Sequence, residues 1–111
     1  MPISIGQRRS ERIILYMPLV VRGVAADSKI FQEEATTLIV NAHGTLLMLG
    51  RKVAVGQTVI VTNPKNWDDC EGKVAYVGAP YAGLARVGIE FTRPAPDFWS
   101  VSSPPADWKR S

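Results

Sequence analysis

Apolar residues along this chain either alternate with polar ones or gather in short β-branched blocks, and Gly, Pro, Asn and Asp separate these blocks. No segment sustains the 3.6-residue period of an amphipathic helix. The pattern therefore predicts an all-β protein, and short strands at regular spacing favour a small antiparallel six-stranded β-barrel. The expected strands cover residues 13–23, 31–40, 45–49, 58–62, 73–77 and 84–91.

Several positions refine this prediction. Pro18 in the first strand indicates an edge position or a bulge, because proline cannot donate to a sheet ladder. The tight connection Ala42-His43-Gly44 is expected to use a positive φ at the glycine. Residues 66–71 are expected to form a polar loop. The last strand alternates most cleanly, with Ala85, Val87, Ile89 and Phe91 on one face and Arg86, Gly88 and Glu90 on the other.

After Arg93 the composition changes, because four prolines are interleaved with large aromatic side chains. Proline restricts the unfolded chain and aromatic rings offer large apolar areas, so this segment is expected to pack back as a strap across an open barrel end. Trp67, Trp99 and Trp108 lack interleaved basic residues, so they are interpreted as packing residues rather than stacking platforms for bases. The predicted organisation is an arginine lead-in at residues 1–12, a barrel at 13–93 and the strap at 94–111.

The length of 111 residues suits a single domain with one core. The longest apolar run, Ile13 to Val21, is too short to span a bilayer. Residues 1–7 lack the features of a secretory signal, so a cytoplasmic location without membrane association is expected. Cys70 is the single cysteine, which excludes an internal disulfide and a cysteine-based zinc site.

The side chains that carry most catalytic chemistry are sparse. His43 is the one histidine, and it lies in a predicted turn with no nucleophile and orienting group beside it. Asp68, Asp69 and Glu71 lack the repeated ligand spacing of a calcium loop and are interpreted as a solvated face. We therefore expect a protein that is not an enzyme and that needs no cofactor or metal.

The lead-in carries the most distinctive chemistry, since Arg8, Arg9 and Arg12 supply three of the thirteen basic residues in a chain of net charge +3. A guanidinium group grips phosphate oxygens in pairs, reads guanine O6 and N7 together and stacks on a base. In an extended segment Arg8 and Arg12 project to one side, which Arg9 does not share. The cluster indicates an anionic ligand with guanine bases, and this small-molecule interpretation is favoured over nucleic acid.

Five features in this order resemble the PilZ family, the bacterial receptor module for the second messenger cyclic di-GMP. They are the Arg-x-x-x-Arg lead-in, a first strand that ends in a hydrophobic-Val-Arg stretch, a hairpin with Gly44 at its turn, the Gly56-Gln57 turn, and Val-Gly-Ile-Glu-Phe at residues 87–91. The resemblance covers nearly the whole chain. It implies that Arg8 and Arg12 clamp the guanines and phosphates, with Arg9 assisting.

The family's second motif, Asp-x-Ser-x-x-Gly, is altered here. With its glycine on Gly44, Ile39 stands at the aspartate position and Asn41 at the serine position. Asn41 keeps a donor and an acceptor, whereas Ile39 has neither. The resemblance thus implies a cyclic di-GMP receptor that signals to a protein partner, with Arg8, Arg9, Arg12, Asn41 and Gly44 as ligand-binding residues. The alternative is a divergent PilZ domain that has lost the nucleotide and serves as a protein-interaction module.

Overall fold

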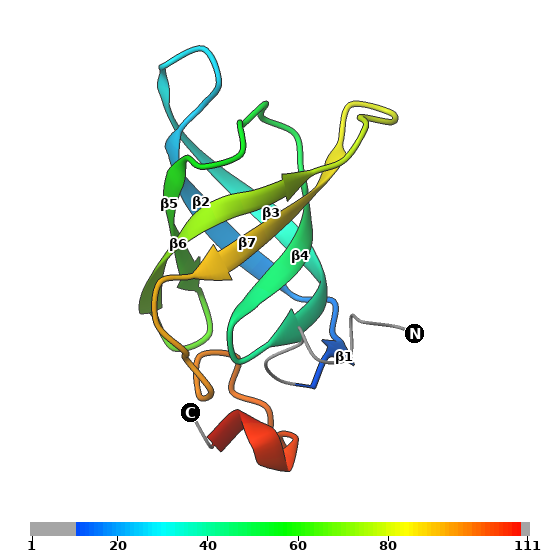
Figure 1. Ribbon diagram of the computed structural model, residues 1–111, viewed down its shortest axis with the longest axis vertical. Coiled ribbons are helices and arrows are strands. Elements are labelled where there is room, and N and C mark those ends of the chain that lie inside the picture. Colours follow the sequence, from blue (N-terminus) through cyan, green and yellow to red (C-terminus); the bar gives the residue numbers. More distant parts are fainter. Residues whose placement is uncertain (1–10, 110–111) are drawn as a thin grey trace.

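The elements of the structure are β1 (Ile13–Ile14), β2 (Pro18–Val24), β3 (Ile30–Asn41), β4 (Gly44–Leu49), β5 (Thr58–Asn63), β6 (Asp68–Val77), β7 (Ala85–Phe91) and the 3-10 helix η1 (Ala106–Lys109). A computed structural model describes residues 11–109. All strand pairings are antiparallel, in the order β1-β3-β2-β5-β6-β7-β4, and β4 pairs back with β3 (Figure 1). Strands β2 to β7 close into a six-stranded barrel and β1 is an extra strand, which confirms the predicted fold class.

Alternation along the strands explains how this sequence fills the barrel. In β7 the side chains of Val87, Ile89 and Phe91 are buried, while Arg86 and Glu90 lie on the outer surface. Leu and Val side chains of β2, β4 and β5 complete the interior in the same way. The face assignment predicted for residues 85–91 is therefore confirmed, and it defines the outer face of the barrel at β7.

The first predicted strand is interrupted and forms β1 and β2. At the interruption, the buried Thr37 hydroxyl donates to the Leu15 carbonyl at 2.5 Å and accepts from the Met17 amide at 3.1 Å. Pro18 begins β2, and at this residue only β3 lies alongside, because pairing with β5 starts at Val20. One continuous strand over 13–23 was thus wrong, and Pro18 is accommodated as a first strand residue.

The β3–β4 hairpin differs from the expected geometry. Asn41 pairs with Gly44, so Ala42 and His43 alone make the turn, and Gly44 is the first residue of β4 without a positive φ. A Cβ at Gly44 would lie 2.1 Å from the Ile89 carbonyl oxygen. Glycine is needed here because β7 approaches closely, not because of backbone handedness. By contrast, Gly56 does have a positive φ of 96°, as its predicted turn requires.

The predicted polar loop over residues 66–71 was also wrong in part, since β6 already begins at Asp68. Strand pairing includes Asp69 because its carboxylate has partners within the sheet. It accepts a hydrogen bond from the Thr62 hydroxyl at 2.6 Å and lies 3.5 Å from the Arg22 guanidinium. Trp67 adopts a φ of 62° in the preceding turn and is 75% exposed. Its expected role in packing is therefore wrong, whereas Trp99 and Trp108 are buried.

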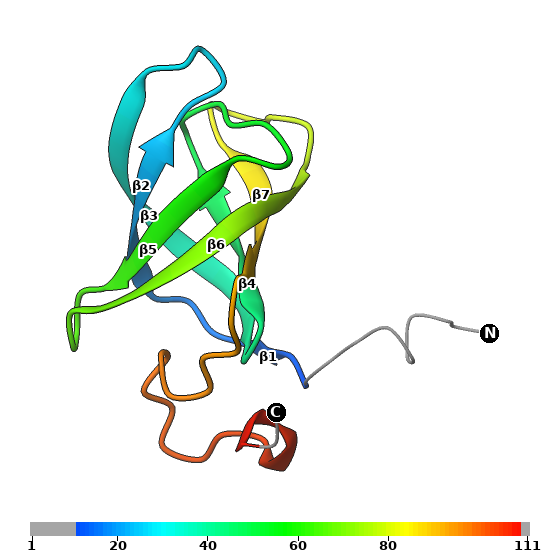
Figure 2. The ribbon, with the colours of Figure 1, turned by 60° about the vertical axis from the view of Figure 1, so that its left-hand side comes forward.

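The C-terminal segment lies across one end of the barrel, as expected for the strap (Figure 2). Phe98 and Trp99 pack edge to face at 4.8 Å between ring centroids, and both contact Phe91 at the end of β7. The buried Asn63 side chain donates to the Phe98 carbonyl at 2.7 Å. Aromatic packing and a buried hydrogen bond thus attach the strap to the ends of β5 and β7.

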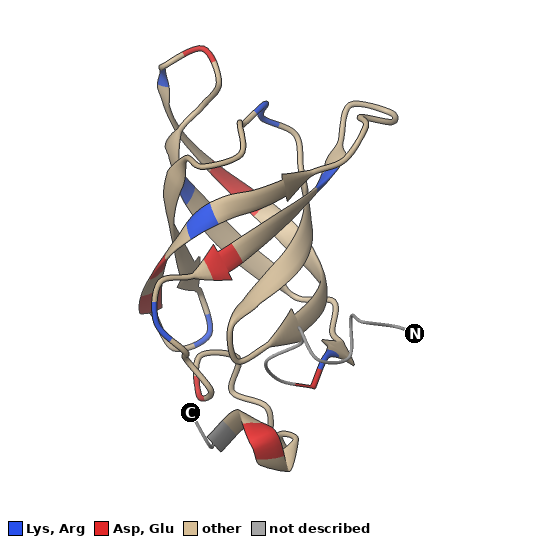
Figure 3. Ribbon diagram, viewed as in Figure 1, with Lys and Arg blue, Asp and Glu red and all other residues tan. Residues whose placement is uncertain are grey.

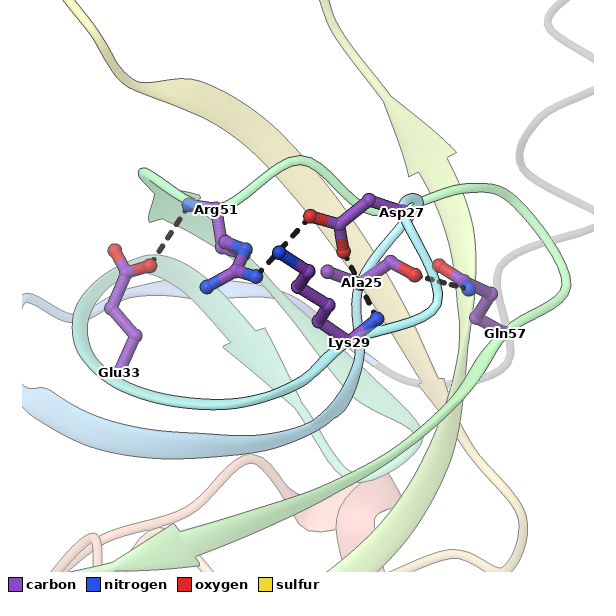
Figure 4. A network of polar contacts seen from close by, with 6 residues as sticks. All are labelled: Ala25, Asp27, Lys29, Glu33, Arg51 and Gln57. Atoms are coloured by element: carbon purple, nitrogen blue, oxygen red, sulfur yellow. Dashed lines mark hydrogen bonds and ion pairs between the residues drawn. The ribbon is translucent and has the colours of Figure 1, made fainter.

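The opposite end of the barrel is held by polar contacts between loops (Figure 4). The Glu33 carboxylate accepts from the Gly50 and Arg51 amides at 2.6 and 2.9 Å. The Arg51 guanidinium lies 3.5 Å from the Asp27 carboxylate, and the Gln57 amide donates to the Ala25 carbonyl at 3.1 Å. Both ends of the barrel are therefore closed, one by aromatic packing and one by hydrogen bonds.

Candidate ligand-binding site

A cavity of about 450 Å³ lies on the outer face of the barrel, where β3, β4, β6 and β7 adjoin. Three of the predicted ligand-binding residues, Arg12, Asn41 and Gly44, line it together. Ile39, at the position of the missing aspartate, lines it as well. Arg8 and Arg9 lie outside the described residues. Arg12 and the hairpin, which are separate in the sequence, thus meet at one surface.

Two register shifts aim side chains at this cavity. In β3, Thr37 pairs with Leu47 and Ile39 with Leu46, so residue 38 is an extra residue. In β6, Val74 pairs with Ile89 and Tyr76 with Gly88, so residue 75 is extra. Such β-bulges reverse which face the following residues present, and they are common beside functional sites. Here they bring Ile39, Asn41 and Tyr76 to the outer face.

Two glycines at the cavity allow close packing of the strands around it. Gly44 and Gly88 both line it, in adjacent strands. A Cβ at Gly44 would overlap the Ile89 carbonyl, and one at Gly88 would come within 3.2 Å of the Tyr76 Cβ. The two glycines therefore allow β7 and the Tyr76 side chain to lie close against the neighbouring strands at the cavity.

The strap fixes the segment that carries Arg12. The Glu11 amide donates to the Asp107 carboxylate at 2.9 Å, and the Trp108 indole donates to the Glu11 carbonyl at 2.6 Å. Trp108 is completely buried, so its position is well determined by packing. Both backbone groups of Glu11 are therefore held by η1, and Arg12 follows directly.

The strap also fixes the hairpin. The Trp99 indole donates to the Asn41 carbonyl at 2.8 Å, and the Ala95 amide donates to the Ala42 carbonyl at 2.7 Å. Within the turn, the Asn41 side-chain oxygen accepts from the His43 amide at 2.8 Å. Asn41 thus shapes the turn through its oxygen, a structural role that its match to the serine position did not indicate.

Tyr76 and Glu90 also line the cavity, and the sequence interpretation did not assign them to a site. Alternation had placed Glu90 on the outer face, but the pairing of β7 with β4, which brings it beside Gly44, was not predicted. Tyr76 is 53% exposed and reaches the outer face through the β6 bulge. No signal in the local pattern marks that bulge.

The charge of the site is set locally. Arg12 and Glu90 are the charged side chains among its described lining residues, and they carry opposite signs. Elsewhere, Lys and Arg lie both in the loops at the two ends of the barrel and along its strands (Figure 3). Within residues 11–109, no three His, Cys, Asp or Glu side chains gather as a metal site would require.

Cys70 lies away from the cavity, in β6. Burial, and then the negative charge of Glu71, raise the pKa of its thiol to about 11. The thiol is therefore protonated at neutral pH, which makes it a poor nucleophile.

Across the described residues there is no helix of the length and apolar character needed to cross a bilayer.

No family model matches the chain, and a search of curated proteins finds no match.

Proposed function

We propose that this protein is a non-enzymatic receptor of the PilZ type, which binds cyclic di-GMP in the bacterial cytoplasm and relays the second messenger to a protein partner. The observation that carries the proposal is the shared cavity of Arg12, Asn41 and Gly44. Arg12 of the lead-in and Gly44 of the hairpin are 32 residues apart in the sequence. Their meeting at one hollow is what a ligand site formed by both motifs requires.

The chemistry of the cavity suits a cyclic dinucleotide. Its volume of about 450 Å³ falls within the usual size of small-molecule sites. Arg12 offers paired donors for phosphate oxygens or for guanine O6 and N7. The exposed Tyr76 ring offers a stacking surface for a base.

Isothermal titration of the whole chain with cyclic di-GMP tests the proposal. The parent protein is expected to bind with a saturable heat. Arg12→Ala should weaken binding by about tenfold or more, because a charge-assisted hydrogen bond is lost. Arg86→Ala is the matched control, since Arg86 lies on the outer face of the same barrel but does not line the cavity. No binding by the parent would overturn the proposal.

A protein-interaction module without nucleotide is the second candidate, and the β6–β7 hairpin favours it. Val77, Tyr81 and Leu84 are exposed there, with Tyr81 at 84%. Exposed apolar residues close together are typical of docking surfaces. The same titration separates the candidates, because the module predicts no heat with cyclic di-GMP at any concentration of the folded parent.

A further inference from the structure

We propose that the end of the barrel opposite the strap docks on an anionic lipid membrane and lies on its surface without crossing it. The inference goes beyond the proposed function and does not depend on the nucleotide. Three loops form this end, which we call the loop end (Figure 1). They are residues 25–29 between β2 and β3, residues 50–57 between β4 and β5, and residues 78–84 between β6 and β7.

The three loops adjoin one another. The Ala26 amide of the first loop donates to the Lys52 carbonyl of the second at 2.8 Å. A Cβ at Gly50 would lie 3.6 Å from the Gly83 carbonyl oxygen, so the third loop lies beside the second. The side chains on these loops therefore belong to one surface of the molecule, although they come from three separate parts of the sequence.

Exposed apolar side chains are concentrated at the loop end. Among the described residues, ten large apolar side chains are exposed, and six of them lie in these loops or on the strand residues next to them. The six are Val24, Ile30, Val55, Val77, Tyr81 and Leu84. Ile30 and Tyr81 are the most exposed of all ten, at 86% and 84%. Apolar residues that gather on one exposed surface mark an interaction site.

The tip of the third loop is fixed in a shape that presents two of these side chains. Tyr81 and Leu84 exchange backbone hydrogen bonds at 2.8 and 3.1 Å. Between them, Ala82 and Gly83 have φ values of 54° and 84°, and two positive φ values are typical of a tight two-residue hairpin turn. The tip therefore needs little ordering when it docks. A tyrosine ring also suits the boundary between lipid headgroups and acyl chains, because it has an apolar body and a polar hydroxyl.

The charges of the loop end favour an anionic surface. Three cations and one carboxylate lie in the loops, a net charge of +2, and these residues are Lys29, Arg51, Lys52 and Asp27. The Asp27 carboxylate lies 3.5 Å from the Arg51 guanidinium, and the neighbouring Glu33 carboxylate accepts from two loop amides (Figure 4). Lys29 and Lys52 are exposed and form no ion pair within residues 11–109. Both ammonium groups are therefore available to an anionic partner.

A cavity between the first two loops adds a place for a headgroup phosphate. Its volume is about 450 Å³, and it is lined by Ala26, Asp27, Gly50, Arg51 and Lys52. Arg51 and Lys52 supply donors for phosphate oxygens there, while Asp27 is already paired with Arg51.

This combination favours a lipid surface over a protein partner. Lysine is depleted in protein–protein interfaces. At a membrane, apolar side chains enter the boundary of the acyl chains while lysine ammonium groups remain among the phosphates. The length of apolar runs along the chain predicted no membrane association, but a surface formed by three loops does not produce such a run.

Cosedimentation with vesicles tests the proposal on the whole chain without nucleotide. One set of vesicles contains phosphatidylcholine alone, and the other also contains phosphatidylglycerol. The parent is expected to bind the anionic vesicles, to bind the neutral ones more weakly, and to dissociate as ionic strength rises. Combining Lys29→Gln with Lys52→Gln should reduce binding to anionic vesicles by about fivefold per lysine. Tyr81→Ser should reduce it by about fivefold or more, because an apolar ring no longer enters the boundary.

Lys65→Gln and Trp67→Ser are the matched controls, since both residues are exposed in the turn between β5 and β6, at the strap end. Unchanged binding by these two variants supports the assignment. Equal losses in the controls would indicate a general attraction of a basic protein and would overturn it. A parent that does not bind anionic vesicles would also overturn it and would leave the loop end to a protein partner.

Two further measurements on the same samples separate the possible causes of a negative result. Unchanged melting temperatures show that the variants are folded. Calorimetry with cyclic di-GMP tests the proposed function independently, because the residues that line its cavity lie outside the three loops.

Discussion

The indole nitrogen of Trp108 donates a hydrogen bond to the carbonyl of Glu11 at 2.6 Å, across 97 residues of sequence. A second strap tryptophan, Trp99, makes the equivalent contact with the carbonyl of Asn41 at 2.8 Å. The two hydrogen bonds hold the residue before Arg12 and the residue at the altered second motif. The strap therefore closes the barrel and also positions both parts of the candidate site.

Trp99→Ala should destabilise the fold by about 3–5 kcal/mol, because the side chain is buried against Phe91 and Phe98. Trp99→Phe keeps much of the packing but leaves the Asn41 carbonyl without its donor, so a smaller loss is expected. Thermal and urea unfolding measure both. A Trp99→Ala variant that melts like the parent would show that the strap contributes nothing to the barrel.

Arg8→Ala and Arg12→Ala are each expected to weaken cyclic di-GMP binding strongly and to leave the melting temperature of the ligand-free protein nearly unchanged. Arg12 is exposed and lines the cavity, so its loss removes ligand contacts and not core packing. Calorimetry and thermal unfolding on the same samples check this. If either variant fails to fold, the arginine cluster has a structural role and the ligand hypothesis loses its main support.

Ile39→Asp should tighten cyclic di-GMP binding, by about tenfold for each 1.4 kcal/mol regained from a new hydrogen bond to guanine. Ile39 lines the cavity and is only half-buried, so the carboxylate keeps access to solvent and to ligand. Asn41 is left unchanged, because its oxygen holds the turn.

Ile39→Asn is the matched control for that substitution, with the same shape and no charge. Folded Ile39→Asp protein that binds no better than Ile39→Asn would show that position 39 does not face a guanine edge.

Gly44→Ala should destabilise the barrel by about 1–3 kcal/mol, the usual penalty for overpacking. The new Cβ would meet the Ile89 carbonyl at 2.1 Å, and backbone cannot move aside as a flexible side chain can. Gly50→Ala is the comparison, because its Cβ meets the end of the Glu33 side chain at 3.1 Å. Equal melting temperatures for the two variants would contradict the close approach of β4 and β7.

Cys70 should react slowly with thiol reagents near neutral pH. With its pKa raised from 9.0 to about 11, the thiolate fraction is about a hundredfold lower than for an ordinary cysteine. The folded state binds this proton more tightly than the unfolded state, so the associated stability is full below pH 9 and declines as pH rises toward 11. Rates of alkylation between pH 7 and 11 test this; rapid labelling at pH 7.5 would contradict it.

Local alternation was sufficient to predict the barrel, because each strand buries one face and the turns carry glycine, proline or asparagine. The features that alternation did not predict depend on contacts with residues that are distant in the sequence. The break after β1 requires the Thr37 hydroxyl from β3, and the early start of β6 requires Thr62 and Arg22 beside Asp69. Neither of these features can be predicted from the residues adjacent to it in the sequence.

The residues of the candidate site also fall into two groups: those that sequence motifs predicted and those that the pairing of strands brings to the site. Arg12, Asn41 and Gly44 were accessible to motif spacing because each motif is continuous in the chain. Glu90 and Tyr76 were not, because they enter the cavity through the pairing of β7 with β4 and through the bulge in β6. Strand order and register are properties of the whole sheet, which a single sequence does not specify position by position.

The extra residue in β3 has a consequence for how related chains are compared. Leu38 changes the odd–even parity of the strand, so Val40 is buried although Thr37 before the bulge is buried too. A chain that lacked residue 38 would pair without the bulge and would still place Ile39 outward and Val40 inward, because the residues after Thr37 would then alternate regularly. Related chains of this fold can therefore differ by one residue at position 38 and keep the same outward and inward side chains, and an alignment that places the gap elsewhere would equate an outward position with a core one.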